Sequence, residues 1–316
     1  MPVLSDPRFK EQDLQNELDS MTPRELELLQ RDKLGTNHPI TETPEMLHDA
    51  LEQLDEELQN IPEKEAYELA EIMCPDYVRS PDFRLMFLRA TCFDAKLAAE
   101  KLVKYWVRKV ALFGPDRAFR KLTIRDLDEE DQVALNKGGV RALPRDEAGR
   151  GVFFSCRSLW DTRRSSSNSM VRLSWLAIHT IIEDVEAQKN GQVAVSINTI
   201  PTHQIASMEN KFCRIVWRDV KEVLPVRMVY VHFFMGSDII RTLLKEIVLY
   251  IVGTREMRAR ASFHHGTVEN FFQTLEEFGI NPENLPSPCT LEEGVNDFDY
   301  QAWLEEQRRI QDIDED

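Results

Sequence analysis

Residues 80–114, SPDFRLMFLRATCFDAKLAAEKLVKYWVRKVALFG, contain two consecutive stretches in which apolar residues recur with the spacing of a helix. In the first stretch, Phe83, Phe87 and Leu88 share one face of a helix. In the second, the spacing of the apolar and basic positions gives a helix with one apolar side and one basic side. A short break at residues 91–94 separates the two, and Asp94 is placed where its carboxylate can accept the first free amides of the second helix. The stretch therefore predicts two amphipathic helices joined by a tight turn.

From Gly138 onward, the pattern changes to strands that alternate with helices. Short runs rich in β-branched and aromatic residues predict the strands, and longer amphipathic runs predict the helices. The predicted strands are 152–160, 193–199, 227–234 and 258–265, and the predicted helices are 169–188, 203–223, 238–252 and 271–278. Repeated strand–helix–strand units imply right-handed crossovers, so the predicted fold class is α/β with a mostly parallel sheet, preceded by an all-helical N-terminal lobe.

The order of residues in 83–104 (an aromatic, Arg-Leu, Phe-Leu-Arg-Ala, then Phe-Asp and a lysine-rich helix) resembles the N-terminal helical module of the CRAL-TRIO family. The segments GVRALPRDEAGRGV (139–152) and LPVRMVYV (224–231) are similar to later parts of the same family, so the resemblance covers roughly 64–295. It implies a soluble carrier of a hydrophobic molecule, with a sheet floor and a mobile gate helix. Three departures, at Asn198, at 233–236 and at 285–289, leave the ligand unidentified.

Four segments follow from composition, capping signals and this resemblance. They are an acidic helical extension (1–63), a helical lobe with its connector (64–137), a lipid-binding domain (138–295) and an acidic C-terminal tail (296–316). Thr22-Pro23 and Thr43-Pro44 are typical helix starts in the extension, and Gly35 is a typical helix end. The extension helix that starts at Thr43 and the tail, with Trp303 and Leu304 as anchors, are candidate docking elements for a protein partner.

Charge is strongly segregated along the chain, whose formal net charge is −16. Residues 1–63 hold 16 acidic against five basic residues, whereas residues 79–125 hold 12 basic against four acidic ones. One interpretation is a basic face that contacts anionic lipid headgroups. The other is that the acidic ends fold over the basic middle and neutralise it. Nucleic acid is not an expected partner, because the acidic ends would repel phosphate.

Residues 237–252, SDIIRTLLKEIVLYIV, predict a helix that is apolar over most of its surface. Such a helix is either buried or in contact with lipid. By resemblance, it is the mobile gate of the pocket; the alternative is an ordinary buried crossover helix. The gate residues would be Ile239, Ile240, Leu243, Leu244, Ile247, Val248 and Ile251.

Two further sets of residues are candidates for the binding site. Apolar side chains of the strands and flanking helices are expected to line the pocket, although core packing would explain any one of them; they are Phe154, Cys156, Trp175, Ile178, Val195, Ile197, Phe212, Val231, Phe233 and Phe263. The resemblance implies that basic residues bind headgroup phosphates, Arg227 first among them, then Arg260, Arg89, Lys101 and Lys104. Arginine suits this task because its fork donates two parallel hydrogen bonds to phosphate.

Enzyme signatures are absent from the sequence. It contains no nucleophile elbow, phosphate-binding lysine loop or dinucleotide fingerprint, and the pair His264-His265 has no third ligand at a supporting spacing. Five cysteines without a CxxC spacing indicate free thiols in a reducing compartment, and no cofactor other than a non-covalent lipid is expected. The predicted function is to enclose a lipid and transfer it between membranes, from the cytoplasm and with transient peripheral membrane contact. The alternative is a scaffold of the same fold that lacks the cavity and acts through protein contacts.

Overall fold

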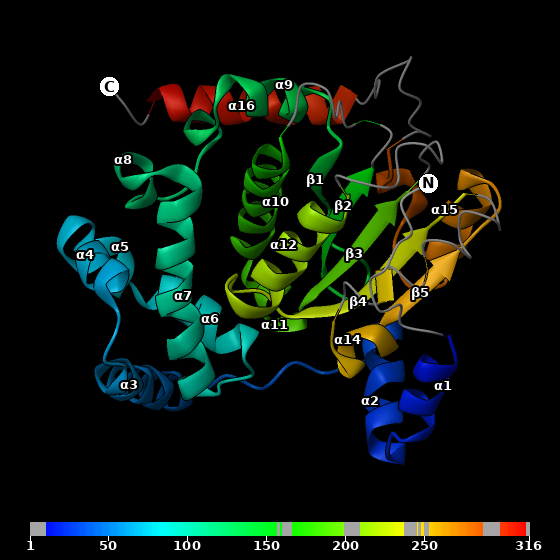
Figure 1. The fold of residues 1–316 in the computed structure, drawn as a ribbon, viewed down its shortest axis with the longest axis horizontal. Helices are drawn as coiled ribbons and strands as arrows, with labels where there is room; N and C mark the ends of the chain where they lie inside the picture. Colours follow the sequence, from blue (N-terminus) through cyan, green and yellow to red (C-terminus); the bar gives the residue numbers. More distant parts are fainter. Residues whose placement is uncertain are drawn as a thin grey trace, which may run out of the picture.

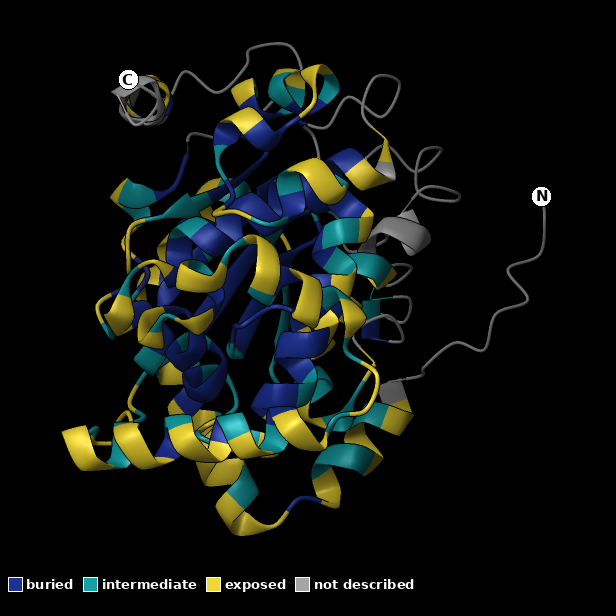
Figure 2. Ribbon diagram, turned by 90° about the vertical axis from the view of Figure 1, so that its left-hand side faces the viewer, coloured by how far each residue is buried: buried dark blue, intermediate teal, exposed yellow. Residues whose placement is uncertain are grey.

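The computed structural model describes residues 11–156, 159, 166–198, 209–236, 245, 248–249, 253–286 and 298–313. Within these ranges the chain forms a helical region followed by a mixed α/β region (Figure 1). Buried residues gather inside the helical region and around the sheet, while the outer helices present exposed faces (Figure 2). No helix in the described part of the chain has the length and apolar character needed to cross a bilayer.

The helical region begins with two helices of the acidic extension, continues through a third, and then forms a packed group around a long central helix. Its members are α1 (Glu11–Asp19), α2 (Pro23–Leu34), α3 (Pro44–Asn60), α4 (Glu65–Met73), α5 (Pro75–Arg79), α6 (Pro81–Ala90), α7 (Ala95–Phe113) and α8 (Pro115–Ala118). The predicted starts are confirmed, because the hydroxyls of Thr22 and Thr43 accept from the backbone amides of Glu25 and Met46. The helices predicted in 80–114 are α6 and α7, and the Leu97 amide donates to the Asp94 carboxylate at 3.0 Å.

The turn between α6 and α7 uses two consecutive residues in the left-handed region, Cys92 (φ 52°) and Phe93 (φ 64°). Few residues other than glycine adopt this conformation, so the surrounding contacts must compensate for its cost. The Phe93 amide donates to the Leu88 carbonyl at 2.7 Å, and Phe93 packs against the core of the helical region. This turn folds α6 back onto α7, with Phe83, Phe87 and Tyr105 in edge-to-face contact.

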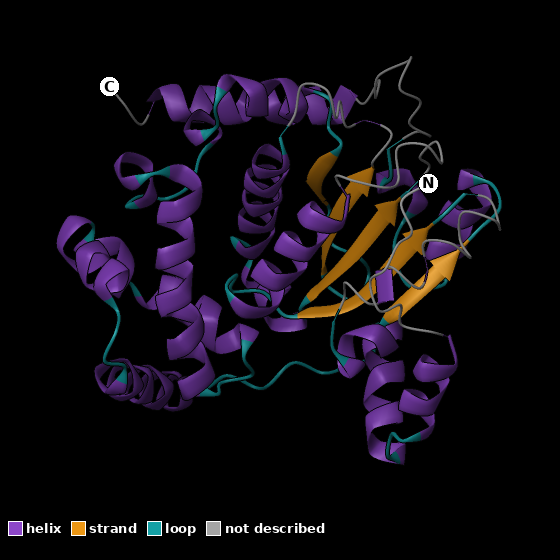
Figure 3. Ribbon diagram, in the orientation of Figure 1, coloured by secondary structure: helices purple, strands orange, loops and turns teal. Residues whose placement is uncertain are grey.

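A five-stranded sheet in the order β1-β2-β3-β4-β5 forms the second region (Figure 3). Its strands are β1 (Val140–Leu143), β2 (Gly151–Cys156), β3 (Gln192–Ile197), β4 (Met228–Phe234) and β5 (Ala261–His264). β1 is antiparallel to β2 and the other pairs are parallel, so the predicted mostly parallel sheet is confirmed. The sequence interpretation missed β1, since a four-residue edge strand carries little periodic signal. It also placed the last strand too early, because Arg258 lies in a short helix before β5.

Helices cover both faces of the sheet. One face carries α10 (Ser167–Ile182) and α12 (Glu209–Glu222), which pack with α7; the other carries α15 (Val268–Glu276). The helix predicted over 169–188 is interrupted at residues 183–184 and continues as α11 (Val185–Asn190). The remaining elements are η1 (Ile124–Asp126), α9 (Glu129–Asn136), α14 (Arg255–Ala259), η4 (Pro282–Asn284) and α16 (Phe298–Ile313).

The acidic ends lie against the rest of the chain. Leu54 and Leu58 of α3 are buried in the core of the helical region. Leu304 of α16 is fully buried in the same core, with Trp303 packed against it, and Gln301 and Arg308 of α16 donate to Asn136 at the end of α9. The two residues expected as anchors for a partner protein therefore pack within their own chain.

Candidate functional site

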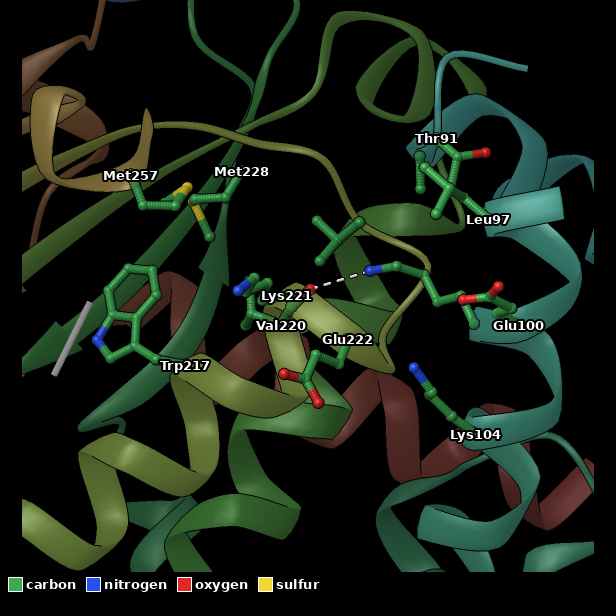
Figure 4. Close-up of a pocket in the computed structure, with 13 residues that line it drawn as sticks. Thr91, Leu97, Glu100, Lys104, Trp217, Val220, Lys221, Glu222, Met228 and Met257 are labelled. Atoms are coloured by element: carbon green, nitrogen blue, oxygen red, sulfur yellow. Dashed lines mark hydrogen bonds between the residues drawn. The ribbon is translucent and has the colours of Figure 1, made fainter. Parts of the chain in front are cut away.

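A pocket of about 380 Å³ opens between α7, α12 and the start of β4 (Figure 4). Its walls come from the end of α6, one face of α7, the last turns of α12, the entry to β4, and α14. The lining residues are Ala90, Thr91, Leu97, Glu100, Lys101, Lys104, Trp217, Val220, Lys221, Glu222, Val226, Met228 and Met257. The volume lies at the small end of the range for small-molecule sites, which is roughly 300–1,000 Å³.

Helical spacing explains which side chains α7 contributes. Leu97, Glu100, Lys101 and Lys104 follow one another at intervals of three, one and three, and therefore share one face. In α12 the same periodicity brings Trp217, Val220 and Lys221 together. These faces of α7 and α12 lie opposite each other across the pocket, and a hydrogen bond from Lys101 to the Val220 carbonyl joins them.

The pocket has an apolar end and a charged end. Trp217, Met228 and Met257 lie together at one end, and Glu100 and Lys104 lie at the other (Figure 4). The apolar end continues into a cluster on the sheet that contains Val231 and Phe233. The rings of Trp217 and Phe233 are 6.2 Å apart, and Phe233 stacks on Phe263 at 5.4 Å. An amphipathic molecule would therefore find an apolar wall and charged groups in one site.

Lys101 is the buried charged group of this pocket. Its Nζ donates to the carbonyls of Leu224 at 2.8 Å and Val220 at 3.1 Å, and the second bond is the dashed line in Figure 4. Val220 lies in the last turn of α12, where the helix offers its carbonyl no further backbone donor, whereas Leu224 lies just beyond α12 and its carbonyl also accepts from the Val226 amide at 2.8 Å. Burial, and then the charge of Lys104, lowers the pKa of Lys101 to about 7, while Glu222 opposes this shift. Near neutral pH, this amine is therefore poised between its charged and neutral forms.

The apolar residues predicted to line one pocket lie in three separate places. Register explains the division, because Phe154 pairs with Val195 and Val195 with His232, so Val231 and Phe233 must point to the opposite face. On the α15 face, Phe154, Cys156, Val195 and Ile197 are packed in a core with that helix. Trp175 and Ile178 of α10 belong to the core of the helical region. Among the members of the set whose side chains are described, Val231, Phe233 and Phe263 lie beside the apolar end of the pocket.

Most of the predicted gate falls outside the described residues, namely Ile239, Ile240, Leu243, Leu244, Ile247 and Ile251. Val248 is described and packs against the cluster of Val231 and Phe233. Phe212 lies in α12, but its side chain is also outside the described part.

The predicted headgroup residues divide into two groups. Lys101 and Lys104 line the pocket. Arg227, Arg260 and Arg89 lie apart from it, and each meets a carboxylate of the N-terminal extension. Arg89 forms a two-pronged pair with Glu42, at 2.8 Å for both bonds, while Arg260 pairs with Asp32 at 2.7 Å. The acidic extension thus neutralises part of the basic surface.

His264, considered above as a metal ligand, instead pairs with a second histidine inside the sheet. His232 Nδ1 and His264 Nε2 are 3.2 Å apart, between β4 and β5. Burial lowers the pKa of His264 to about 4 and that of His232 well below its ordinary value. Both imidazoles are therefore neutral at physiological pH.

Sequence reasoning missed the apolar end of the pocket. Trp217 shares a helical face with Val220, a spacing visible in the sequence, and Met228 is the second residue of a predicted strand. Met257 carried no local signal, since it lies in a helix of five residues and reaches the pocket only through the chain's return to β5.

Comparisons with known proteins do not assign the chain to a family. No family model matches it, and no curated protein matches it. Among solved structures, the crystal structure of Sfh5 aligns with 86% of this chain and 100% of its own, at 11% identity and a TM-score of 0.48. A similarity of this size identifies neither a ligand nor an activity.

Proposed function

We propose that this protein encloses an amphipathic lipid and carries or presents it between membranes, without chemistry on the ligand. The observation that carries the proposal is the pocket between α7 and α12, where Trp217, Met228 and Met257 form an apolar end and Lys101 and Lys104 line the charged side. Apolar walls with a few placed polar groups are typical of small-molecule sites. The pocket, as the described residues line it, has a volume that suits an amphiphile with a single acyl chain.

The ligand is proposed to carry an anionic headgroup. Three lysines, Lys101, Lys104 and Lys221, line the pocket with only two glutamates, Glu100 and Glu222. A negative charge beside Lys101 favours its protonated form, so binding takes up a proton near neutral pH. Transient contact with anionic membranes, including phosphoinositides, is proposed to use Arg227, Arg260 and Arg89; vesicle binding that survives in Arg227→Ala would argue against this part.

Native mass spectrometry of the purified protein, followed by lipid extraction, tests the proposal. We expect a stoichiometric lipid in the wild type and its loss in Met228→Trp, because the indole fills the apolar end of the pocket. Met73→Trp is the matched control, since Met73 lies on α4 with 60% exposure and away from the pocket. A wild-type protein that is empty and takes up nothing from a lipid mixture would instead favour the scaffold, in which Phe233 and Phe263 fill the site.

A further inference from the structure

Basic residues gather at the amino edge of the parallel sheet. In a parallel sheet the starts of all strands meet at one edge, and here Lys189 precedes β3, Arg227 precedes β4 and Arg260 precedes β5. Arg255 and Arg258 lie in α14, just before β5. Arg89 joins the group from α6, donating to Gln188 at 2.6 Å. We call these six residues the amino-edge row.

The N-terminal extension places four carboxylates on this row. Glu17 accepts from Arg258 at 2.8 Å, and Glu25 from Arg255 at 2.5 Å. Asp32 pairs with Arg260 at 2.7 Å and lies 3.9 Å from Arg227. Glu42 pairs with Arg89 at 2.8 Å and lies 3.9 Å from Lys189. In Figure 1, α1 and α2 accordingly lie below the ends of β4 and β5, and the segment leading to α3 runs from there toward α7.

Charge, more than apolar packing, holds this extension in place. Among the described side chains of residues 12–43, only Met21 and Asp32 are buried, whereas Leu26, Leu28, Leu34 and Ile40 are all more than 40% exposed. The end of α2 is the anchor, because Arg150 donates to the carbonyls of Asp32 and Lys33. The parts on either side of this anchor, which carry Glu17, Glu25 and Glu42, have little buried apolar surface to lose.

A hollow of about 190 Å³ lies beneath the segment 37–42. Three basic side chains line it, Arg89, Lys189 and Arg227, but Glu42 is the only carboxylate among its lining residues. Glu42 is therefore the anion inside the hollow, while Asp32 and Glu186 meet Arg227 and Lys189 from outside it, at 3.9 Å and 3.5 Å respectively.

We propose that residues 11–43 are a tethered competitor for the amino-edge row: Glu17, Glu25 and Glu42 occupy it in the free protein, and the phosphate groups of anionic membrane lipids displace them. The inference rests on the membrane contact proposed above and adds Arg255, Arg258 and Lys189 to it. A phosphate monoester, as on a phosphoinositide headgroup, is a stronger competitor than a single carboxylate, because it brings three acceptor oxygens and nearly two charges to the same arginines. The anchor at Arg150 stays in place, so the displaced segments remain attached.

The test compares two triple variants of the full chain in co-sedimentation with phosphatidylcholine vesicles that contain phosphatidylinositol bisphosphate. Glu17→Gln/Glu25→Gln/Glu42→Gln removes the competitor, whereas Glu27→Gln/Glu45→Gln/Glu56→Gln removes the same charge from exposed glutamates of the extension that do not contact the row. We expect the first to bind about tenfold more tightly than the second, from three ion pairs of ordinary strength. Equal binding of the two would overturn the proposal.

A second measurement needs no substitution. Hydrogen exchange of residues 11–43 in the wild type should become faster when vesicles are added, and unchanged exchange in the presence of bound vesicles would contradict displacement. Inositol hexakisphosphate supplies the same phosphates without a membrane; if it displaces the extension while vesicles do not, the membrane is not the partner. If the wild type takes up no lipid but the Glu17→Gln/Glu25→Gln/Glu42→Gln variant binds vesicles more tightly, the carrier function is refuted and the competitor proposal stands.

Discussion

Replacing Lys101 by methionine should change stability with a sign that depends on pH. Methionine keeps the volume of the side chain but removes the amine, and with it the two bonds to the carbonyls of Val220 and Leu224. It also removes the cost of holding an ammonium group in a buried place. The first effect is the same at every pH. The second is fully present below the folded-state pKa of Lys101 and is lost progressively as the pH rises toward the pKa of the unfolded chain.

The pKa of Lys101 provides the magnitude. A shift from 10.5 to about 7 corresponds to roughly 5 kcal/mol of destabilisation at low pH. Between these values the unfolded chain binds more protons than the folded one, so wild-type stability rises with pH across this window. Without the amine, the Val220 carbonyl loses its donor at a cost of about 1–3 kcal/mol, whereas the Leu224 carbonyl keeps the Val226 amide. Lys101→Met should therefore stabilise the protein near pH 6 and destabilise it near pH 10. The change that it causes in the free energy of unfolding should differ by about 4 kcal/mol between the two pH values.

Urea denaturation followed by tryptophan fluorescence, at both pH values, measures this difference. Lys96→Met is the matched control, because Lys96 lies on α7 and is exposed; its effect should stay within about 0.5 kcal/mol at either pH. If the effect of Lys101→Met differs by less than about 1 kcal/mol between the two conditions, the amine is not held at a depressed pKa and the argument for Lys101 as a proton-coupled contact fails.

Three further predictions concern stability. Arg150→Ala should lower the free energy of unfolding by about 3–5 kcal/mol in urea titrations, because it leaves the buried Asp146 carboxylate, 2.6 Å away, without its partner; a loss below about 1 kcal/mol would contradict this. The urea midpoint of unfolding should fall as the pH drops from about 6.5 to about 4, because His232 and His264 bind protons in the unfolded chain but stay neutral when buried. His232→Leu/His264→Leu should make the midpoint less dependent on pH, and an unchanged dependence would show that other groups cause it. Leu54→Ala in α3 should cost about 2–5 kcal/mol, whereas Leu26→Ala, at a 41% exposed site, should cost under about 0.5 kcal/mol; similar losses would mean that α3 is not part of the core.

Local signals in the sequence predicted α2 and α3 of the extension, the turn at 91–94 and the four parallel strands. Each depends on residues close together in the chain: a threonine or aspartate that caps its own helix, a 3.6-residue period, or a run of β-branched residues. β1 escaped because it is short and at the edge. The helix over 237–252 remains a prediction, since most of it lies outside the described residues.

The site depended on contacts between distant parts of the chain. Alternation along a strand shows which residues share a face, but only the pairing between strands places Val195 and Val231 on opposite faces. The pocket joins α7 to residues more than 100 positions later, and the carboxylate that meets Arg260 is Asp32. Sequence established that acidic and basic segments are separate; whether they would meet was a question of geometry. Local hydrogen bonds and periodicity act over a few residues, whereas cavities and ion pairs depend on how the finished elements pack.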